Sequence, residues 1–250
     1  MFLCKNSDIP ILFVHVWKGG GTSVASGISK ALLAKYGRLW FWRWVKRPLA
    51  SSESSLLGNE PICHLPACDI LPLLKKRGYN DLFRIGVVRS PWARLVSMYQ
   101  FTVRDRIAFD KRFGARGVNR PLVPQEKRGL DIAYCYYTEC PYLGFQRWLK
   151  NSQHMAMGSL VTWPIAMVPQ SYWYFGLNGD QLVQHIYRLD HLEDLRSDLL
   201  ERFDLQIDIP QKNVGSYDRD LSRYYDEEAL AFVEKYHGDD IRHFCFKRPF

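Results

Sequence analysis

A glycine-rich loop near the N-terminus has the residue types of an anion-binding site. The loop consists of Lys18, Gly19, Gly20, Gly21, Thr22 and Ser23. Glycines allow backbone N–H groups to point toward a ligand, and a helix expected directly after the loop offers unpaired N–H groups and a positive dipole end. The alternative is a plain glycine turn before a core helix, with Lys18 in solvent, and the loop alone does not decide between the two.

The loop differs from the Walker A motif, in which a lysine follows the last glycine and a hydroxyl holds magnesium. Here Lys18 precedes the glycines. A second buried strand ends in Arg89-Ser90, where a P-loop NTPase places a metal-binding aspartate. We therefore predict a site for a phosphorylated nucleotide that needs no metal, and we assign no metal ligands.

A second set of polar residues follows that strand. Arg89 comes directly after it, and Ser97 lies eight residues later, on roughly the same face of the expected helix as Ser90. An arginine fork and a serine hydroxyl suit a second phosphate. Taken singly, Arg89 is equally explained by an ordinary salt bridge and Ser97 by packing.

Alternating strands and helices position these residues. The apolar runs predict strands at Ile9–Val16, Leu82–Val88 and Val183–Arg188. The expected helices are Thr22–Tyr36, Pro91–Arg104, Tyr142–Lys150, Asp190–Arg202 and Asp226–Tyr236. This alternation is typical of a three-layer α/β fold with a central, mainly parallel sheet flanked by helices, and since no linker divides the chain we expect one domain over residues 1–250.

Composition adds broad limits. The 250 residues include 34 Lys and Arg against 26 Asp and Glu, a net charge of +8 that favours anionic partners without choosing among them. Neither a signal peptide nor a membrane-spanning run is recognised, so a soluble, cytoplasmic protein is expected. The six cysteines are too sparse for a disulfide scaffold and lack a zinc pattern, which favours free thiols.

These segments resemble the sulfotransferases, in particular the carbohydrate type grouped as sulfotransferase family 2. The family's first loop is similar to H-I-P-K-T-G-G-T-S, and residues 15–23 are HVWKGGGTS. Its later motif is similar to V-R-N-P-W-x-R-L-V-S-x-Y, and residues 88–99 are VRSPWARLVSMY. Further similar segments are Val168-Pro169-Gln170, Arg188–Glu193, Asn213, Tyr224-Tyr225 and Asp239-Asp240-Ile241. The resemblance covers nearly the whole chain in the expected order.

The resemblance implies a P-loop-like fold that binds 3′-phosphoadenosine 5′-phosphosulfate (PAPS) and releases 3′-phosphoadenosine 5′-phosphate (PAP). The loop from Lys18 to Ser23 would hold the 5′-phosphosulfate, and Arg89 and Ser97 the 3′-phosphate. Family analogy adds Lys212 and Ser216 as nucleotide contacts. The chain departs from the family pattern at Trp17, where proline is usual, and at Gly19, where threonine is usual.

Sulfuryl transfer requires a cation for the leaving phosphate and a base for the acceptor hydroxyl. Lys18 is the expected cation. His64 is the candidate base, because some family members use a histidine between the first helix and the second phosphate strand. Glu60 and Glu53 are alternatives, since other members use a glutamate, and Asp69 is a weaker one.

The acceptor is the least determined part of the prediction. By family, a carbohydrate hydroxyl is expected, with a lipid or small-molecule alcohol as the alternative and no nucleic-acid partner. Trp40, Trp42 and Trp44 could contact sugars, a membrane surface or the core, and Arg104–Arg128 carries eight Lys and Arg against three Asp and Glu. Two rival functions remain at this point: a nucleotide kinase and a non-catalytic binder of polyanions. The sequence does not indicate an oligomeric state.

Overall fold

The computed structural model describes residues 2–3, 10–36, 65–112, 140–156, 168–210 and 217–250. The chain divides into two compact units. Unit 1 comprises Met1–Arg89 and Gln170–Val214, and unit 2 comprises Ser90–Pro169 and Gly215–Phe250. The single domain expected over residues 1–250 stays a prediction.

Unit 1 contains a four-stranded sheet in the order β1 (Phe2–Leu3), β2 (Ile11–Val14), β3 (Phe83–Val88) and β4 (His185–Arg188). β2, β3 and β4 are parallel, and the short β1 pairs antiparallel to β2. The three parallel strands are joined by crossover connections, so their carboxyl ends lie at the same edge of the sheet. The predicted mixed α/β architecture with a mainly parallel sheet is confirmed.

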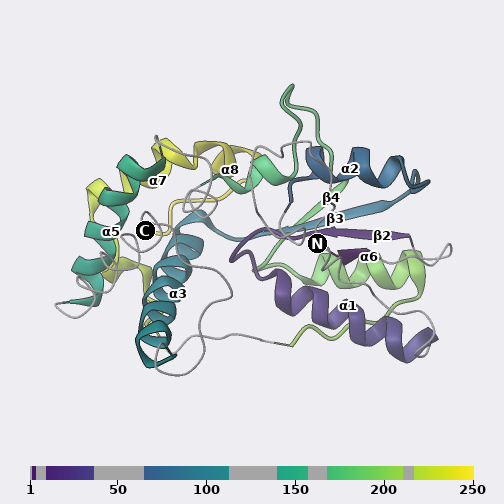
Figure 1. Ribbon diagram of the computed structural model, residues 1–250, viewed down its shortest axis with the longest axis horizontal. Coiled ribbons are helices and arrows are strands. Elements are labelled where there is room, and N and C mark those ends of the chain that lie inside the picture. Colours follow the sequence, from purple (N-terminus) through teal and green to yellow (C-terminus); the bar gives the residue numbers. More distant parts are fainter. Residues whose placement is uncertain (1, 4–9, 37–64, 113–139, 157–167, 211–216) are drawn as a thin grey trace. The chain divides into compact units, whose positions relative to one another are not determined.

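Helices cover both faces of this sheet. Figure 1 shows α1 (Gly21–Tyr36) and α6 (Glu193–Phe203) on one face and α2 (Ala67–Lys75) on the other. The core between the sheet and helices α1 and α6 is formed by Ile11, Phe13, Val24, Ala25, Ile28, Leu32, Ile85, Val87, Tyr187, Leu195, Leu199, Leu205 and Ile207. The continuous apolar runs of the strands and the helical spacing of the apolar residues along α1 are the patterns that predict these elements.

Lys35, in the last turn of α1, also ties this helix to the end of α6. Its Nζ donates to the carbonyl oxygens of Phe203 and Asp204 at 3.0 and 2.7 Å and to the Asp204 carboxylate at 2.8 Å. Phe203 is the last residue of α6 and Asp204 is its C-cap, where carbonyl oxygens have no partner within the helix. One lysine therefore caps α6 and fixes the two helices to each other.

Some predicted boundaries were wrong. The helix expected from Asp190 begins at Glu193, because the Asp190 carboxylate is bound by the Arg188 guanidinium at 2.7 and 3.1 Å instead of capping the helix. This ion pair lowers the pKa of Asp190. The helix α3 (Pro91–Arg112) continues past the predicted end at Arg104, so the first part of the segment read as a basic loop is helical.

The helix α2 was not expected from the sequence pattern. Two prolines obscure it: Pro66 precedes the first turn, and Pro72 lies inside the helix, where proline removes a backbone donor. Ile70 and Leu74 are nevertheless buried one turn apart. The helix is stabilised by packing of this apolar stripe rather than by intrinsic helix propensity.

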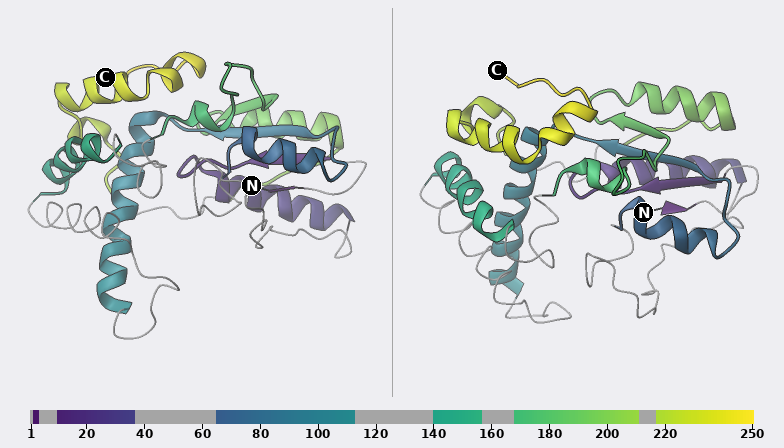
Figure 2. Two further views of the ribbon diagram at one scale, coloured as in Figure 1. Left: turned by 45° about the horizontal axis from the view of Figure 1, so that its top comes forward. Right: turned by 90° about the horizontal axis from the view of Figure 1, so that it is seen from above.

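Unit 2 is helical. Figure 2 shows α5 (Pro141–Ala156) and α7 (Glu227–Tyr236) beside α3, followed by the short α8 (Gly238–His243). A 3₁₀ turn, η5 (Leu221–Arg223), precedes α7. The Tyr225 hydroxyl donates to the Trp92 carbonyl oxygen at 2.8 Å, and Gln100 donates to the Tyr224 hydroxyl at 3.3 Å. The tyrosine pair that the family resemblance singled out therefore fastens the C-terminal segment to α3.

Arg94, His237 and Asp240 are fully buried in the described part of unit 2. His237 Nδ1 lies 3.8 Å from Asp240 Oδ2, and Arg94 donates to the Val168 carbonyl oxygen at 3.0 Å. Burial lowers the pKa of His237, with Arg94 acting in the same direction and Asp240 opposing it. The imidazole is therefore neutral near pH 7 inside an otherwise charged cluster, which fits a structural role in joining α3 to α7 and α8.

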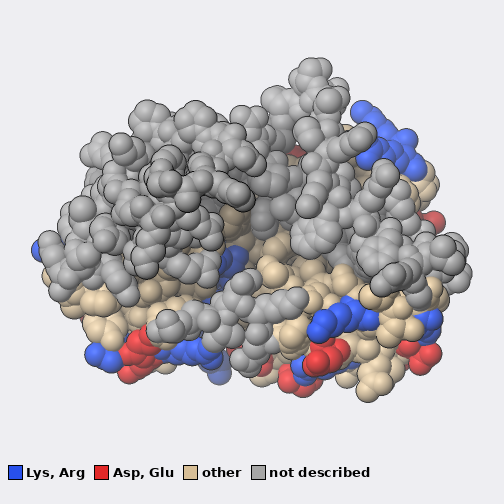
Figure 3. All heavy atoms as spheres, turned by 60° about the horizontal axis from the view of Figure 1, so that its bottom comes forward, with Lys and Arg blue, Asp and Glu red and all other residues tan. Residues whose placement is uncertain are grey.

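Within the described ranges, no helix has the length and apolarity needed to cross a membrane; the cytoplasmic location stays a prediction. Cys68, Cys140 and Cys245 are free thiols, as expected. On the face drawn in Figure 3, described Lys and Arg side chains alternate with Asp and Glu along the lower edge. This part of the surface is therefore mixed in charge despite the net positive balance of the chain.

Candidate active site

The predicted phosphate loop connects β2 to α1. β2 ends at Val14, residues 17–20 form a turn, and α1 begins at Gly21. The turn has two left-handed residues, Lys18 with φ 60° and Gly20 with φ 87°. A lysine in this region is unusual because its Cβ crowds the backbone. The loop therefore curls directly before the N-terminus of α1, where the first N–H groups of a helix lack intrahelical acceptors.

Each glycine of the loop is required by a close neighbour. A Cβ on Gly19 would lie 3.0 Å from the Val87 carbonyl oxygen, and one on Gly21 would lie 2.0 Å from the ring of the buried His15. A Cβ on Gly20 would lie 2.4 Å from Leu189 Cδ1. A side chain at position 19 would therefore pack tightly against this carbonyl oxygen, so the threonine usual in the family would need a small shift of the backbone.

We expect Gly20→Ala to lower the free energy of unfolding by about 1–3 kcal/mol, because it combines a positive φ with overpacking against Leu189. Gly179→Ala is the matched control: Gly179 also has φ 87°, but nothing lies within 4 Å of its added Cβ. Urea unfolding of both variants separates the two contributions. Equal destabilisation of the two variants would show that close packing of the loop against Leu189 contributes nothing.

Arg89 lies at the carboxyl end of β3, the strand next to β2. The Gly19–Val87 approach shows that the loop and this strand end are neighbours within unit 1. The Arg89 N–H donates to Gln170 Oε1 at 3.0 Å, and Gln170 Nε2 donates to the Arg89 carbonyl oxygen at 2.7 Å. Among the described residues, no carboxylate pairs with the Arg89 guanidinium. The ordinary salt bridge considered from the sequence is therefore not formed within that part of the chain.

The 3₁₀ segment η4 (Gln170–Trp173) and Tyr174 after it were given no function from the sequence. The Tyr174 hydroxyl donates to the Val87 carbonyl oxygen at 2.9 Å, and its ring leaves no space for a Cβ on Gly86, which would lie 2.3 Å away. A glycine inside a buried strand indicates close approach of another group. Gly86 was thus the signal in the sequence that a segment crosses β3 here.

Several predicted residues lie outside the described part of the chain. These are His64, Lys212, Ser216, Glu53, Glu60, Trp40, Trp42 and Trp44. Ser97 is described; it lies partly buried on α3 in unit 2. The structure thus places the loop and Arg89 at one edge of the sheet in unit 1, and the assignments of the other residues stay predictions.

Asp69 is the one candidate base that the structure describes. It lies in the first turn of α2, with Oδ1 3.8 Å from the Cys68 thiol, and its buried Oδ2 has no hydrogen-bond partner in the described structure. Burial raises the pKa of Asp69. It also raises the pKa of the adjacent Cys68 thiol. A carboxyl with a raised pKa is a suitable proton acceptor, so Asp69 is a stronger alternative than the sequence suggested.

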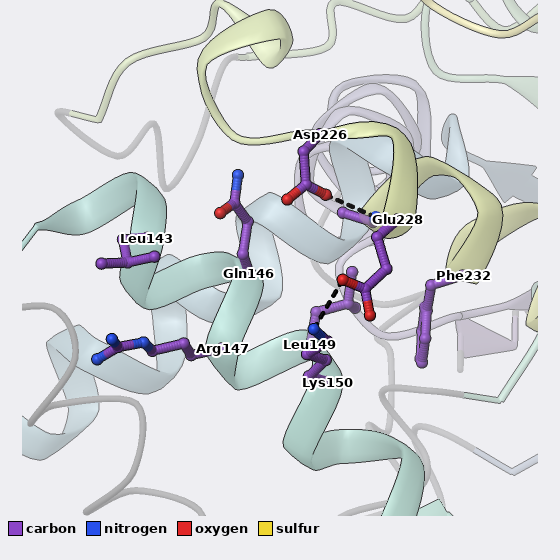
Figure 4. A pocket seen from close by; sticks show the side chains of 9 residues that line it. Leu143, Gln146, Arg147, Leu149, Lys150, Asp226, Glu228 and Phe232 are labelled. Atoms are coloured by element: carbon purple, nitrogen blue, oxygen red, sulfur yellow. Dashed lines mark hydrogen bonds and ion pairs between the residues drawn. The ribbon is translucent and has the colours of Figure 1, made fainter.

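One cavity lined by described residues lies between α5 and α7 of unit 2, with a volume of about 250 Å³ (Figure 4). Leu149 and Phe232 contribute apolar walls, and a Lys150–Glu228 ion pair of 2.7 Å spans it. It contains none of the predicted site residues. Within the described ranges, no three His, Cys, Asp or Glu side chains are grouped as metal ligands would be.

The glycines of the loop pack closely against the rest of unit 1, with 2.0 to 3.0 Å between an added Cβ and the nearest protein atom. The loop directly precedes the N-terminus of α1, where N–H groups lack intrahelical acceptors. The segment also bears a lysine held in a left-handed conformation at the turn. The role of the loop in holding a phosphate stays a prediction.

Comparison with known proteins gives the family. The model of the family described as "Sulfotransferase family" matches residues 7–247, which include the loop, Arg89 and most of both units. Searches of curated proteins and of solved structures gave no significant match. Sulfotransferases take the sulfuryl group from PAPS. This nucleotide carries a 5′-phosphosulfate and a 3′-phosphate, the groups that the loop and Arg89 are expected to bind. The chain therefore belongs to the sulfotransferase family and is a PAPS-dependent enzyme that transfers a sulfuryl group to a hydroxyl-bearing acceptor.

Proposed function

We propose that this sulfotransferase acts on a carbohydrate hydroxyl by in-line displacement, with Lys18 stabilising the leaving phosphate and His64 as the base. The observation that carries the nucleotide part of the proposal is the loop after β2. It presents a lysine with φ 60° and glycine backbone directly before the N-terminus of α1. The carbohydrate acceptor rests on the type of sulfotransferase that the sequence resembles.

Different residues of the chain bind the two ends of the nucleotide. The backbone and side chains of Lys18, Gly19, Gly20, Gly21, Thr22 and Ser23 hold the 5′-phosphosulfate, and Arg89 and Ser97 hold the 3′-phosphate, with Lys212 and Ser216 as further contacts. Arg89 is suited to this role because a guanidinium forms paired hydrogen bonds with phosphate oxygens. No metal is required, since cationic side chains and N–H groups supply the charge.

The transfer balances without a further reactant. PAPS supplies the sulfuryl group, whose bond to the bridging phosphate oxygen breaks as the acceptor oxygen bonds to sulfur. Lys18 neutralises the charge that develops on the leaving oxygen, and fixed charges of this kind act most strongly where charge builds up in the transition state. His64 takes the proton of the acceptor hydroxyl. The products are the sulfate ester and PAP.

A thermal-shift titration with PAP tests the nucleotide site. PAP at a hundred times its dissociation constant stabilises a protein by roughly 2.7 kcal/mol, which gives a clear rise in Tm. We expect this rise to persist in EDTA and to be much smaller with adenosine 5′-phosphate (AMP), which lacks the 3′-phosphate. A shift with magnesium ATP in place of PAP would contradict the proposal and favour the kinase alternative.

The acceptor is tested by incubating the enzyme with PAPS and following PAP release. Release on addition of uncharged or uronic-acid-containing oligosaccharides, with sulfate recovered on the sugar, supports the carbohydrate acceptor. Release only with phenols or lipid alcohols would contradict it and favour the small-molecule alternative. Salt-sensitive binding of heparin without any turnover would favour the polyanion binder.

A further inference from the structure

We propose that Gln170 is the positioning residue that gives this enzyme its preference for a 3′-phosphorylated nucleotide. It would do so by fixing the backbone of Arg89. The inference rests on the proposed function of Arg89 as a ligand of the 3′-phosphate, and it adds a residue to which neither the family match nor the sequence motifs give a role.

Gln170 replaces a neighbouring strand at the end of β3. The pairing between β3 and β4 ends with Val88 opposite Arg188, and the Leu189 N–H then donates to the Val88 carbonyl oxygen at 2.8 Å. Arg89 lies one residue beyond this ladder. The side-chain amide of Gln170 binds both its N–H, at 3.0 Å, and its carbonyl oxygen, at 2.7 Å, as a strand would.

This arrangement is buried and rigid. Gln170 has an exposed fraction of 0%, so water does not compete for its two hydrogen bonds. The segment that carries it is fastened to the same strand a second time, through the Tyr174 hydroxyl on the Val87 carbonyl oxygen at 2.9 Å. The Tyr174 ring is itself buried against Gly86. Gln170 therefore holds Arg89 from a fixed position.

The direction in which an arginine leaves the chain depends on its backbone. With both backbone groups of Arg89 fixed, the guanidinium begins from one defined Cα–Cβ direction, and less conformational freedom is lost when it binds a phosphate. Loss of the Gln170 amide would release this backbone and leave its N–H and carbonyl without their buried partner. The nucleotide phosphate at the other end, held by the loop after β2, would not be affected directly.

The experiment measures Kd for PAP and for AMP by calorimetry, in the wild type, Arg89→Ala, Gln170→Met and Tyr174→Phe. The ratio of the Kd for AMP to the Kd for PAP measures how strongly the 3′-phosphate is recognised. We expect Arg89→Ala and Gln170→Met each to reduce this ratio about tenfold or more, as misplacement of a binding group does, with the Kd for AMP changed less than threefold. Tyr174→Phe removes the hydrogen bond from the Tyr174 hydroxyl to the Val87 carbonyl oxygen and is expected to keep the wild-type ratio.

The outcomes separate the two proposals. If the wild type does not prefer PAP, or if Arg89→Ala keeps the preference, the proposed function of Arg89 fails. The inference is overturned if Arg89→Ala loses the preference but Gln170→Met keeps it. It is also overturned if Gln170→Met weakens the binding of PAP and of AMP equally, because Gln170 then has only a structural role. Should Gln170→Met not fold, Gln170→Asn, which shortens the amide by one methylene, takes its place with the same expected loss of the ratio.

Discussion

Lys18→Met is expected to lower kcat by about 10²–10³-fold while the Kd for PAP rises much less, the pattern of a group that acts mainly in the transition state. Methionine keeps the length of the side chain and removes its charge. It also meets the same backbone conformation, φ 60°, so the free energy of unfolding should change little. Initial rates with saturating PAPS and acceptor, together with PAP titrations, test this expectation.

Lys30→Met is the matched control, because Lys30 is exposed on α1 and its replacement removes the same charge from the same unit. We expect that variant to retain wild-type kcat. The proposed role of Lys18 would be refuted if Lys18→Met kept kcat within twofold. A fall in PAP affinity with kcat unchanged would likewise refute it, since Lys18 would then stabilise the bound nucleotide and the transition state equally.

The sequence predicts most elements of the sheet unit because their apolar patterns are strong. β2, β3 and β4 each lie inside a predicted strand, and α1 begins one residue before its predicted start. The errors occur where a tertiary contact competes with a local signal. Asp190 has the residue type of a helix cap but binds Arg188, and the prolines of α2 conceal a helix that its buried face stabilises.

His64→Ala is expected to lower kcat about a hundredfold or more, with PAP binding retained, because it removes the proposed acceptor of the hydroxyl proton. With a histidine base, activity in the wild type should fall as the pH drops below about 6.5, where the imidazole gains a proton and can no longer accept one. Rates across the pH range and PAP titrations of the variant measure the two effects.

Asp69→Asn distinguishes the alternative base. It removes the carboxylate whose pKa is raised by burial on α2, while keeping the size of the side chain. If His64 is the base, Asp69→Asn should retain at least a third of wild-type kcat. A hundredfold loss in Asp69→Asn, together with near wild-type turnover in His64→Ala, would assign the base to Asp69 instead.

The candidate site was predictable only in its residue types. Lys18 and the glycines were recognisable, but the sequence did not show that the Val87 carbonyl oxygen lies close beside Gly19. Nor did it show that Gln170, distant in the chain, binds the backbone of Arg89. Both facts depend on which segments meet at the end of β3, and hydrophobic periodicity does not encode such contacts.

The left-handed conformation of Lys18 has a consequence for protein engineering. Holding a non-glycine residue there costs about 1 kcal/mol, which glycine at the same position would recover. A thermostability screen that ignores turnover would therefore enrich glycine at position 18 and discard the cation on which the proposed transfer depends. At this position, directed evolution for stability and directed evolution for activity select different residues.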